Sequence, residues 1–418
     1  MSFKSVFSGL VVLGALCQPL SALALSIESA VEQALARDAG LRELDRKARA
    51  FDHLAVAESA LPDPEVTIGA EGLPIDDPLS ADMMTMYRIG VRQRFPAGDS
   101  RRLAGDRNSA RARAVAADLR ARELEVALQT RLAWLDWVSA RASADQVDAM
   151  LEQLGQLVSI TQRRFQAGSG RLQDESQALL ELALLERRRV DAQTSMDEAR
   201  ARLERWIGPL TPGAADPRLP QWSLQESPGD DIPAQLSRHP ELIAAGIRVE
   251  AEEVAADLAR QAYRPQWMLE AGYGHQRGKD PSGRRMSDKL FAMATISLPL
   301  FTDDRQDRRV DAALAERDAQ QAQAQLILQR LSGELARQQA LQARLAESRE
   351  LLEQRILPRA QDTVDATLSA YESDRASFDE LVRARLRQLE IDLDLIDTRR
   401  RQLGAIARIA SLTDKELP

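Results

Sequence analysis

The chain has 418 residues, of which 44% are hydrophobic, 29% are charged and only 4% are aromatic. Its abundant Ala, Leu, Arg, Gln and Glu lead the helix-propensity scale, so the composition favours a mainly helical fold. The formal net charge is −8 and the arginines are interleaved with acidic residues, which argues against a nucleic-acid partner because such a partner requires a clustered basic surface. No phosphate-binding glycine loop, nucleophile elbow or HExxH motif occurs, so we expect neither an enzyme nor a cofactor.

Residues 1–24 have the pattern of a signal peptide. Lys4 supplies the positive start, an apolar core follows, and Ala22-Leu23-Ala24 forms an A-x-A cleavage site. The single cysteine, Cys17, would leave with this segment. An alternative is a lipoprotein signal at Cys17, although Leu16 is bulky for the position before a lipidated cysteine.

The first repeat is expected over residues 25–208. A helix pattern covers residues 26–60, and two stretches that alternate apolar and polar residues follow at about 64–73 and 86–96. Alternation with a period of two predicts strands with one apolar and one polar face. A long helical pattern without proline then fills residues 99–167, and a turn at about 166–172 leads into a second long helix.

The same order returns after a proline-rich linker at 209–232. The second repeat, 233–412, contains a helix, two alternating strands at about 265–276 and 288–301, and a long helical hairpin with its turn at about 371–377. A short tail, 413–418, follows. The two turns share a pattern, since Phe165 and Gly168 precede Asp174 as Tyr371 and Asp374 precede Glu380. Such a repeat predicts one body built from two similar halves.

The strands and helices together point to a membrane conduit. After the signal no apolar run reaches the ~20 residues of a transmembrane helix, so a spanning element would have to be a barrel strand. Four strands cannot close a barrel, and open edges in lipid leave backbone groups unpaired, so spanning strands require an oligomer. The long helical patterns would reach about 100 Å, and their apolar residues step by 4, 3, 4 as in a coiled coil. A soluble antiparallel sheet with one face on a core is the alternative for the strands.

The doubled plan resembles the TolC-like outer-membrane efflux proteins. The matching features are Pro299-Leu300-Phe301 before a long helix, Leu357-Pro358 ahead of the second turn, and turns of the Phe/Tyr-x-x-Gly type followed by an acid. Residues 62–65, Pro-Asp-Pro-Glu, are more weakly similar to the heavy-metal efflux branch. The resemblance implies mainly helical chains with four strands each, which assemble as a homotrimer with a twelve-stranded β-barrel in outer-membrane lipid and an α-barrel in the periplasm. It also implies docking onto a periplasmic adaptor and an inner-membrane pump of the RND type.

Three groups of functional residues are predicted on this basis. A gate at the hairpin tips would contain Asp174, Glu380, Asp379 and Arg383, although Arg383 replaces an acid of the family pattern. The adaptor would dock on the tip residues Arg164, Phe165, Gly168, Ser169, Tyr371, Asp374 and Arg375. Lipid would contact the strand residues Val66, Ile68, Ile89, Val91, Leu269, Ile296 and Leu298.

Other sequence features leave alternatives open. Asp174 and Glu380 also suit the acidic N-terminal turn of an ordinary helix. His53, His239 and His275 are far apart and have no metal-ligand spacing, so we expect no metal site. A channel for type I protein secretion would share the fold with an efflux channel. A soluble periplasmic coiled-coil scaffold or adaptor is the alternative of a different class.

Overall fold

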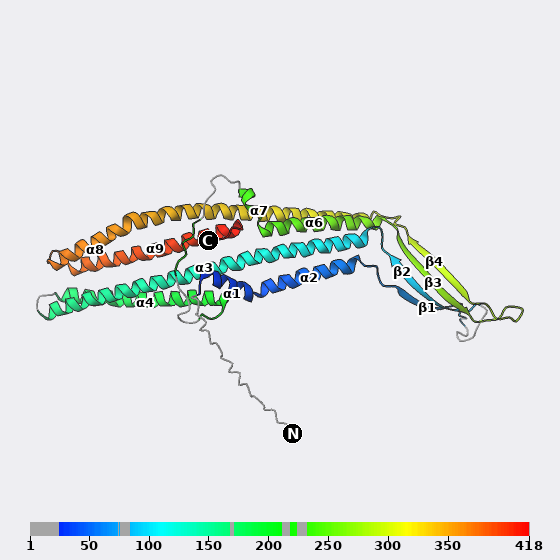
Figure 1. Ribbon diagram of the computed structural model, residues 1–418, viewed down its shortest axis with the longest axis horizontal. Coiled ribbons are helices and arrows are strands. Elements are labelled where there is room, and N and C mark those ends of the chain that lie inside the picture. Colours follow the sequence, from blue (N-terminus) through cyan, green and yellow to red (C-terminus); the bar gives the residue numbers. More distant parts are fainter. Residues whose placement is uncertain are drawn as a thin grey trace, which may run out of the picture.

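The computed structural model describes residues 25–73, 75, 84–167, 171–210, 218–223 and 232–417. The predicted signal peptide, with Lys4 and Cys17, lies outside the described residues. The protein is elongated, with a small sheet at one end and the turns of two helical hairpins at the other (Figure 1). No described helix is both long and apolar enough to cross a membrane.

Among its described residues, the first half contains four helices and two strands, and its longest helix has 67 residues, which corresponds to about 100 Å. In chain order its elements are α1 (Ile27–Arg37), α2 (Ala39–Ser59), β1 (Glu65–Glu71), β2 (Met86–Phe95), α3 (Ser100–Gln166) and α4 (Leu172–Ile207).

The prediction of one continuous helix over residues 26–60 was wrong, because the chain breaks at Asp38. The Asp38 backbone is extended, and its side chain accepts a hydrogen bond of 2.9 Å from the Leu41 N–H at the start of α2. Arg122 of α3 lies 2.8 Å from the same carboxylate. This hydrogen bond from Arg122 is the main cause that lowers the pKa of Asp38. A cap that also binds a neighbouring helix therefore divides the segment in two.

The second half repeats this plan with a short extra helix at its start. Its elements are α5 (Ile232–Leu236), α6 (Pro240–Arg260), the 3₁₀ turn η1 (Gln261–Tyr263), β3 (Gln266–Gln276), β4 (Lys289–Ser297), α7 (Gln306–Leu351), the π-helical turn η2 (Leu352–Ile356), α8 (Leu357–Glu372) and α9 (Phe378–Leu412).

The long helix of the second repeat is interrupted by η2 just before Pro358. The N–H of Leu357 bonds to the carbonyl of Leu352, five residues earlier, instead of four. Proline lacks an N–H and its ring collides with the carbonyl of an ideal preceding turn, so a wider turn relieves the clash. The corresponding helix of the first repeat, α3, has no proline and runs without a break.

The four strands form one antiparallel sheet in the order β1-β2-β3-β4. β2 of the first repeat pairs with β3 of the second, with Gly90 opposite Gly272 and Arg92 opposite Glu270. The expected fourth strand is shorter than predicted, because β4 ends at Ser297 and Pro299 cannot donate to a ladder. Leu298 consequently lies just beyond the strand.

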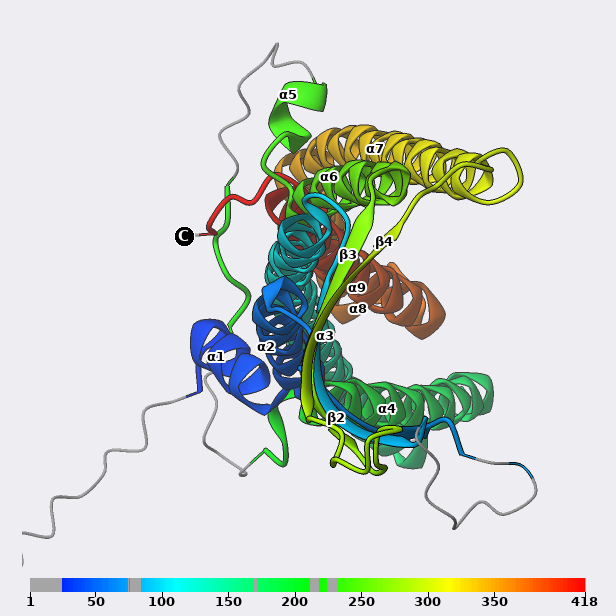
Figure 2. The ribbon, with the colours of Figure 1, turned by 90° about the vertical axis from the view of Figure 1, so that its right-hand side faces the viewer.

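Sheet and helices curve together. Figure 2 shows the sheet as an arc, with α7 and α4 extending on its concave side and α1 on its convex side. The central hydrophobic core lies beneath α1, where Trp134 and Trp137 of α3 meet edge to face at 5.5 Å and pack with Leu203, Leu403 and residues of α1. A second core near the tips joins α3, α4 and α9. The fold thus has a continuous concave face opposite its main core.

Candidate functional site

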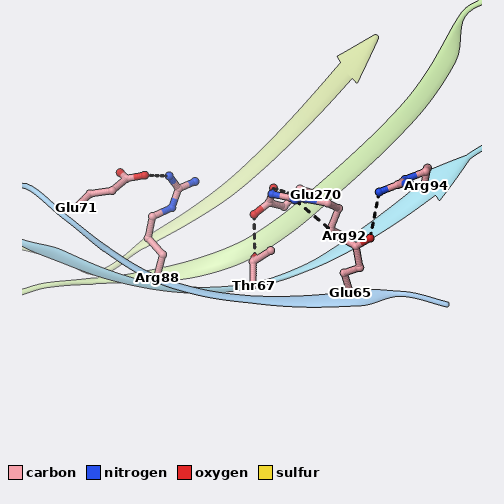
Figure 3. Close-up of polar contacts among 7 residues, drawn as sticks. All are labelled: Glu65, Thr67, Glu71, Arg88, Arg92, Arg94 and Glu270. Carbon is pink, nitrogen blue, oxygen red and sulfur yellow. Dashed lines mark hydrogen bonds and ion pairs between the residues drawn. The ribbon is translucent and has the colours of Figure 1, made fainter. Parts of the chain in front are cut away.

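Polar side chains cover one face of the sheet and bind one another across strands. Glu270 on β3 accepts hydrogen bonds from Thr67 of β1 at 3.0 Å and from Arg92 of β2 at 3.0 Å (Figure 3). Arg94 lies 3.2 Å from Glu65, and Figure 3 shows a further pair between Arg88 and Glu71. This ladder of ion pairs forms a charged but internally neutralised strip.

The sequence predicted that these side chains face water, but it did not predict their pairing. Strand register decides which charges meet, and the register joins residues from the two repeats. Glu270 is only 8% exposed, because its partners on both neighbouring strands cover the carboxylate. Opposite charges at alternating positions of two predicted strands are the only signal that could have suggested the pairing.

An aromatic ring covers two glycines on the same face. Phe291 of β4 lies over the cross-strand pair Gly90 and Gly272, and a Cβ added at Gly272 would lie 2.5 Å from the ring. The Arg88 guanidinium stacks above Phe291 at 3.8 Å from the ring centroid. Glycine at positions 90 and 272 allows the Phe291 ring to lie close to the sheet, whereas a larger side chain at Gly272 would push the ring away.

The opposite face of the sheet is apolar and exposed in the single chain. Cross-strand pairing places Val66 opposite Val91 and Ile68 opposite Ile89, and the same face continues through Tyr273 and Leu290. Exposure of Ile68 reaches 81%. The residues predicted to contact lipid that lie within strands share this face: Val66, Ile68, Ile89, Val91, Leu269 and Ile296. A large exposed apolar surface of this kind normally contacts lipid or another protein.

At the opposite end, the tips of the two hairpins are joined to each other. Arg164 near the end of α3 lies 2.6 Å from Asp374 in the turn between α8 and α9, and its guanidinium stands over the Tyr371 ring at 5.5 Å. Asp374 has a φ of 54°, a left-handed conformation that Asp tolerates better than most residues. The structure therefore brings three of the predicted docking residues together in one contact.

The other predicted docking residues are less connected. Phe165 is exposed, and Arg375 donates a hydrogen bond to Ser373 at 3.1 Å within its own turn. Gly168 and Ser169 lie outside the described residues. Whether any of these residues contacts another protein stays a prediction.

The predicted gate acids begin the returning helices of the two hairpins. Glu380 forms a capping box with Ser377, whose N–H donates to the carboxylate at 2.7 Å, and these hydrogen bonds lower the pKa of Glu380. Asp379 pairs with Arg383 one turn later on the same helix. Asp174 lies in the first turn of α4. These acids thus lie at or near the starts of the returning helices. Their role in a gate stays a prediction.

Within the described residues, no group of three or more His, Cys, Asp or Glu side chains could hold a metal ion. His239 caps α6, where its Nδ1 accepts from the Glu241 N–H at 3.3 Å, and His275 contacts Asp288 at 2.7 Å.

The geometry, a half-apolar sheet on long curved hairpins, can be compared with that of known proteins. Residues 232–414 match the family model described as "Outer membrane efflux protein". The chain is also 30% identical over 211 residues to fusaric acid resistance protein FusA of Burkholderia cepacia, which corresponds to 49% of this chain and 40% of that protein. The match to this curated relative therefore spans less than half of its length.

Solved structures share the fold over nearly the whole chain. CusC, reported in a study of transmembrane channel formation, has 18% identity and a TM-score of 0.78, with 93% of this chain and 92% of that chain covered. The open state of the Neisseria gonorrhoeae MtrE outer membrane channel has 16% identity and a TM-score of 0.78, with 93% and 89% covered. The OprN outer-membrane channel has 19% identity and a TM-score of 0.78, with 93% and 90% covered.

The second half of the chain thus matches the outer-membrane efflux family, and nearly the whole chain shares the fold of solved outer-membrane channels. These matches confirm the resemblance and the fold class inferred from the sequence.

Proposed function

We propose that this chain is the outer-membrane channel subunit of a tripartite efflux system, in which it forms a passive, gated exit duct. The observation that carries this proposal is the two-faced sheet at the end of the hairpins. One face exposes Ile68 and Ile89, and the other binds its charges in internal pairs such as Arg92 with Glu270. Such a sheet suits a wall with lipid on one side and water on the other.

The open edges of the sheet support a trimer. β1 and β4 each pair with one neighbour in the described chain, so one edge of each strand has no partner. An unpaired edge in hydrocarbon costs several kcal/mol per backbone group, which closure removes. Two chains would give a narrow eight-stranded barrel, whereas three give twelve strands and a wider pore.

The hairpin tips would serve as gate and docking surface. In a trimer, each Arg164–Asp374 contact and each Glu380 would be repeated three times around the axis. The turns would then present Phe165 and Tyr371 to a periplasmic adaptor, which would connect the duct to an inner-membrane pump of the RND type. Exposure of Phe165 at the tip supports a binding role for that side chain.

Small solutes are the favoured cargo. The partial relative is named for resistance to fusaric acid, a small molecule, which supports efflux over type I protein secretion. Metal cations are a second cargo class, suggested by the weak similarity of residues 62–65 to the heavy-metal efflux branch. The described residues contain no metal-binding cluster to favour it.

Fractionation and mass measurement test the proposal. The protein should separate with outer membranes and require detergent for extraction. After subtraction of bound detergent, its mass should be three times that of one chain, which is 46.3 kDa before any signal peptide is removed. In planar bilayers it should conduct ions. A water-soluble periplasmic monomer would refute the channel and support the scaffold alternative, whereas a conducting dimer would refute only the trimer.

A further inference from the structure

The concave face of the helices carries a dense group of arginines halfway along the molecule. On α4, Leu203 and Ile207 pack into the core beneath α1. Arg205 lies two residues from each of them, which is about 200° around the helix, so it projects to the other side. On α9, Arg408 lies two residues after Ile406 of the same core, so it also projects away from that core. Arg205 and Arg408 therefore project from the helix faces opposite α1, and this side of the helices is the concave side in Figure 2.

These side chains line a hollow of about 540 Å³ between α3, α4, α7 and α9. Asp136 is the single acidic residue among its described lining residues. The arginines of this hollow, which we call the arginine hollow, are Arg202, Arg205, Arg337, Arg400, Arg401 and Arg408.

Nearby acids neutralise only part of this charge. Arg400 lies 2.8 Å from Asp136 and 2.7 Å from Asp397, and Arg337 lies 2.7 Å from Glu334. In contrast, Arg202, Arg205 and Arg408 form no ion pair with any residue in the described part of the chain. The arginine hollow consequently has an excess of positive charge.

One of these arginines is poorly solvated. Burial is the main cause that lowers the pKa of Arg408, and the neighbouring Arg337 and Arg400 lower it further. Gly404, one turn earlier, adds no side chain to the hollow, and a Cβ there would lie 3.2 Å from Arg408 Nη1. A guanidinium stays charged in proteins, so a partly buried one without a partner is stabilised by an incoming anion.

The remaining lining indicates what kind of anion fits. Leu132, Leu341 and Trp206 place apolar surface beside the guanidinium groups. Arginine binds a carboxylate through two parallel hydrogen bonds, and an apolar wall accommodates a hydrocarbon or aromatic body.

We propose that the arginine hollow is a binding site for small amphiphilic carboxylates that pass through the channel. The proposal rests on the proposed channel function, because only a channel makes this concave face part of the exit path. It assigns the chain a preference among cargoes, namely organic anions over neutral analogues of the same shape.

The test uses the purified full-length protein in detergent, titrated calorimetrically with benzoate at low ionic strength. Benzoate should bind, and its neutral analogue benzamide should bind more weakly. Arg202→Gln/Arg205→Gln should weaken benzoate binding about tenfold or more, because the loss of each charge-assisted hydrogen bond lowers affinity by roughly tenfold. Both side chains are exposed, so the variant should fold.

The matched control is Arg42→Gln/Arg46→Gln, which removes the same charge from exposed positions of α2 outside the hollow. It should bind benzoate as the parent does. Absence of benzoate binding by the parent, equal binding of benzamide, or equal weakening by both double variants would overturn the proposal. Single-channel recordings on the same preparation separate the two hypotheses. A conducting protein without benzoate binding refutes the binding site alone, and a preparation that never conducts refutes the channel.

Discussion

Arg164 Nη2 lies 2.6 Å from Asp374 Oδ1, and this contact joins the tips of two hairpins that are 210 positions apart in the sequence. The Tyr371 ring supports the same guanidinium from below, at 5.5 Å. These interactions are the main cause that raises the pKa of Arg164. The contact adds to the second hydrophobic core, which joins α3, α4 and α9 near the tips.

We expect Asp374→Asn to increase the opening of the channel. Asparagine tolerates the left-handed backbone at this position but removes the charge. An exposed ion pair contributes about 0.2–1 kcal/mol, so three lost pairs should shift the opening equilibrium by about 3-fold to about 160-fold. Single-channel open probability in planar bilayers measures the shift.

Arg164→Ala should reproduce this effect, and Arg163→Ala should not, since Arg163 is exposed and adjacent. If both arginine variants behave alike, the contact between the tips does not restrain the gate.

The acids at the tip should determine ion selectivity. Asp174→Ala/Glu380→Ala should reduce the preference for cations, because three copies of each carboxylate would surround the axis. The reversal potential under a salt gradient measures the preference. Ser377→Ala is the control, since it removes the cap of α9 but retains the negative charge. Selectivity unchanged in the double variant would mean that these acids act only at helix ends.

The negative charge of Glu380 and the stability of its helix cap should decrease as the pH falls. Hydrogen bonds from the Ser377 backbone and then from its side chain lower the pKa of Glu380 below its ordinary value. Its charge, and the stability its cap contributes, should therefore be complete above the ordinary carboxyl pKa and be lost as pH falls through the depressed value. In Ser377→Ala the loss should begin at higher pH.

Arginine on the two faces of β4 should have unequal effects. Ile296→Arg would place charge on the apolar face, at a cost of about 2–4 kcal/mol if the residue is near mid-bilayer. Thr295→Arg is the adjacent control, and it faces the polar side, opposite Met268. Urea denaturation of the protein refolded in lipid measures both. Equal destabilisation would contradict the assignment of the lipid-facing side.

Glu270, by contrast, is a poor polar-face control for arginine substitutions in the sheet. Its polarity suggested a tolerant position facing water, but it is buried and bonded to Thr67 and Arg92. We expect any substitution there to leave Arg92 without its main partner.

Gly272→Ala should weaken the barrel wall. A Cβ at this position would lie 2.4 Å from the Ile89 carbonyl oxygen and would displace Phe291. Gly69→Ala adds the same atom to the same sheet where nothing lies within 4 Å. The thermal stability of the assembled protein should fall for Gly272→Ala alone. A similar loss in both variants would indicate a general effect of removing strand glycines.

The amino-acid sequence by itself determined the local and periodic features of this protein. Alternation along residues such as Val66, Ile68 and Glu65 predicts strands and their faces, and the repeated turn patterns at Phe165 and Tyr371 predict two hairpins. These signals are readable because each depends on the spacing of neighbouring residues. The break at Asp38 was missed, since a helix-compatible pattern continues across it and the capping aspartate is stabilised by Arg122 from another helix.

Only the tertiary structure decided which distant residues meet. The pairing of Arg92 with Glu270, the contact of Arg164 with Asp374, and the assembly of the arginine hollow all join residues more than 100 positions apart. Charges recur along every helix of this chain, and local spacing cannot distinguish those that face solvent from those that converge. Their partners depend on strand register and on the rotation of each helix about its axis, which the packing of the whole chain sets.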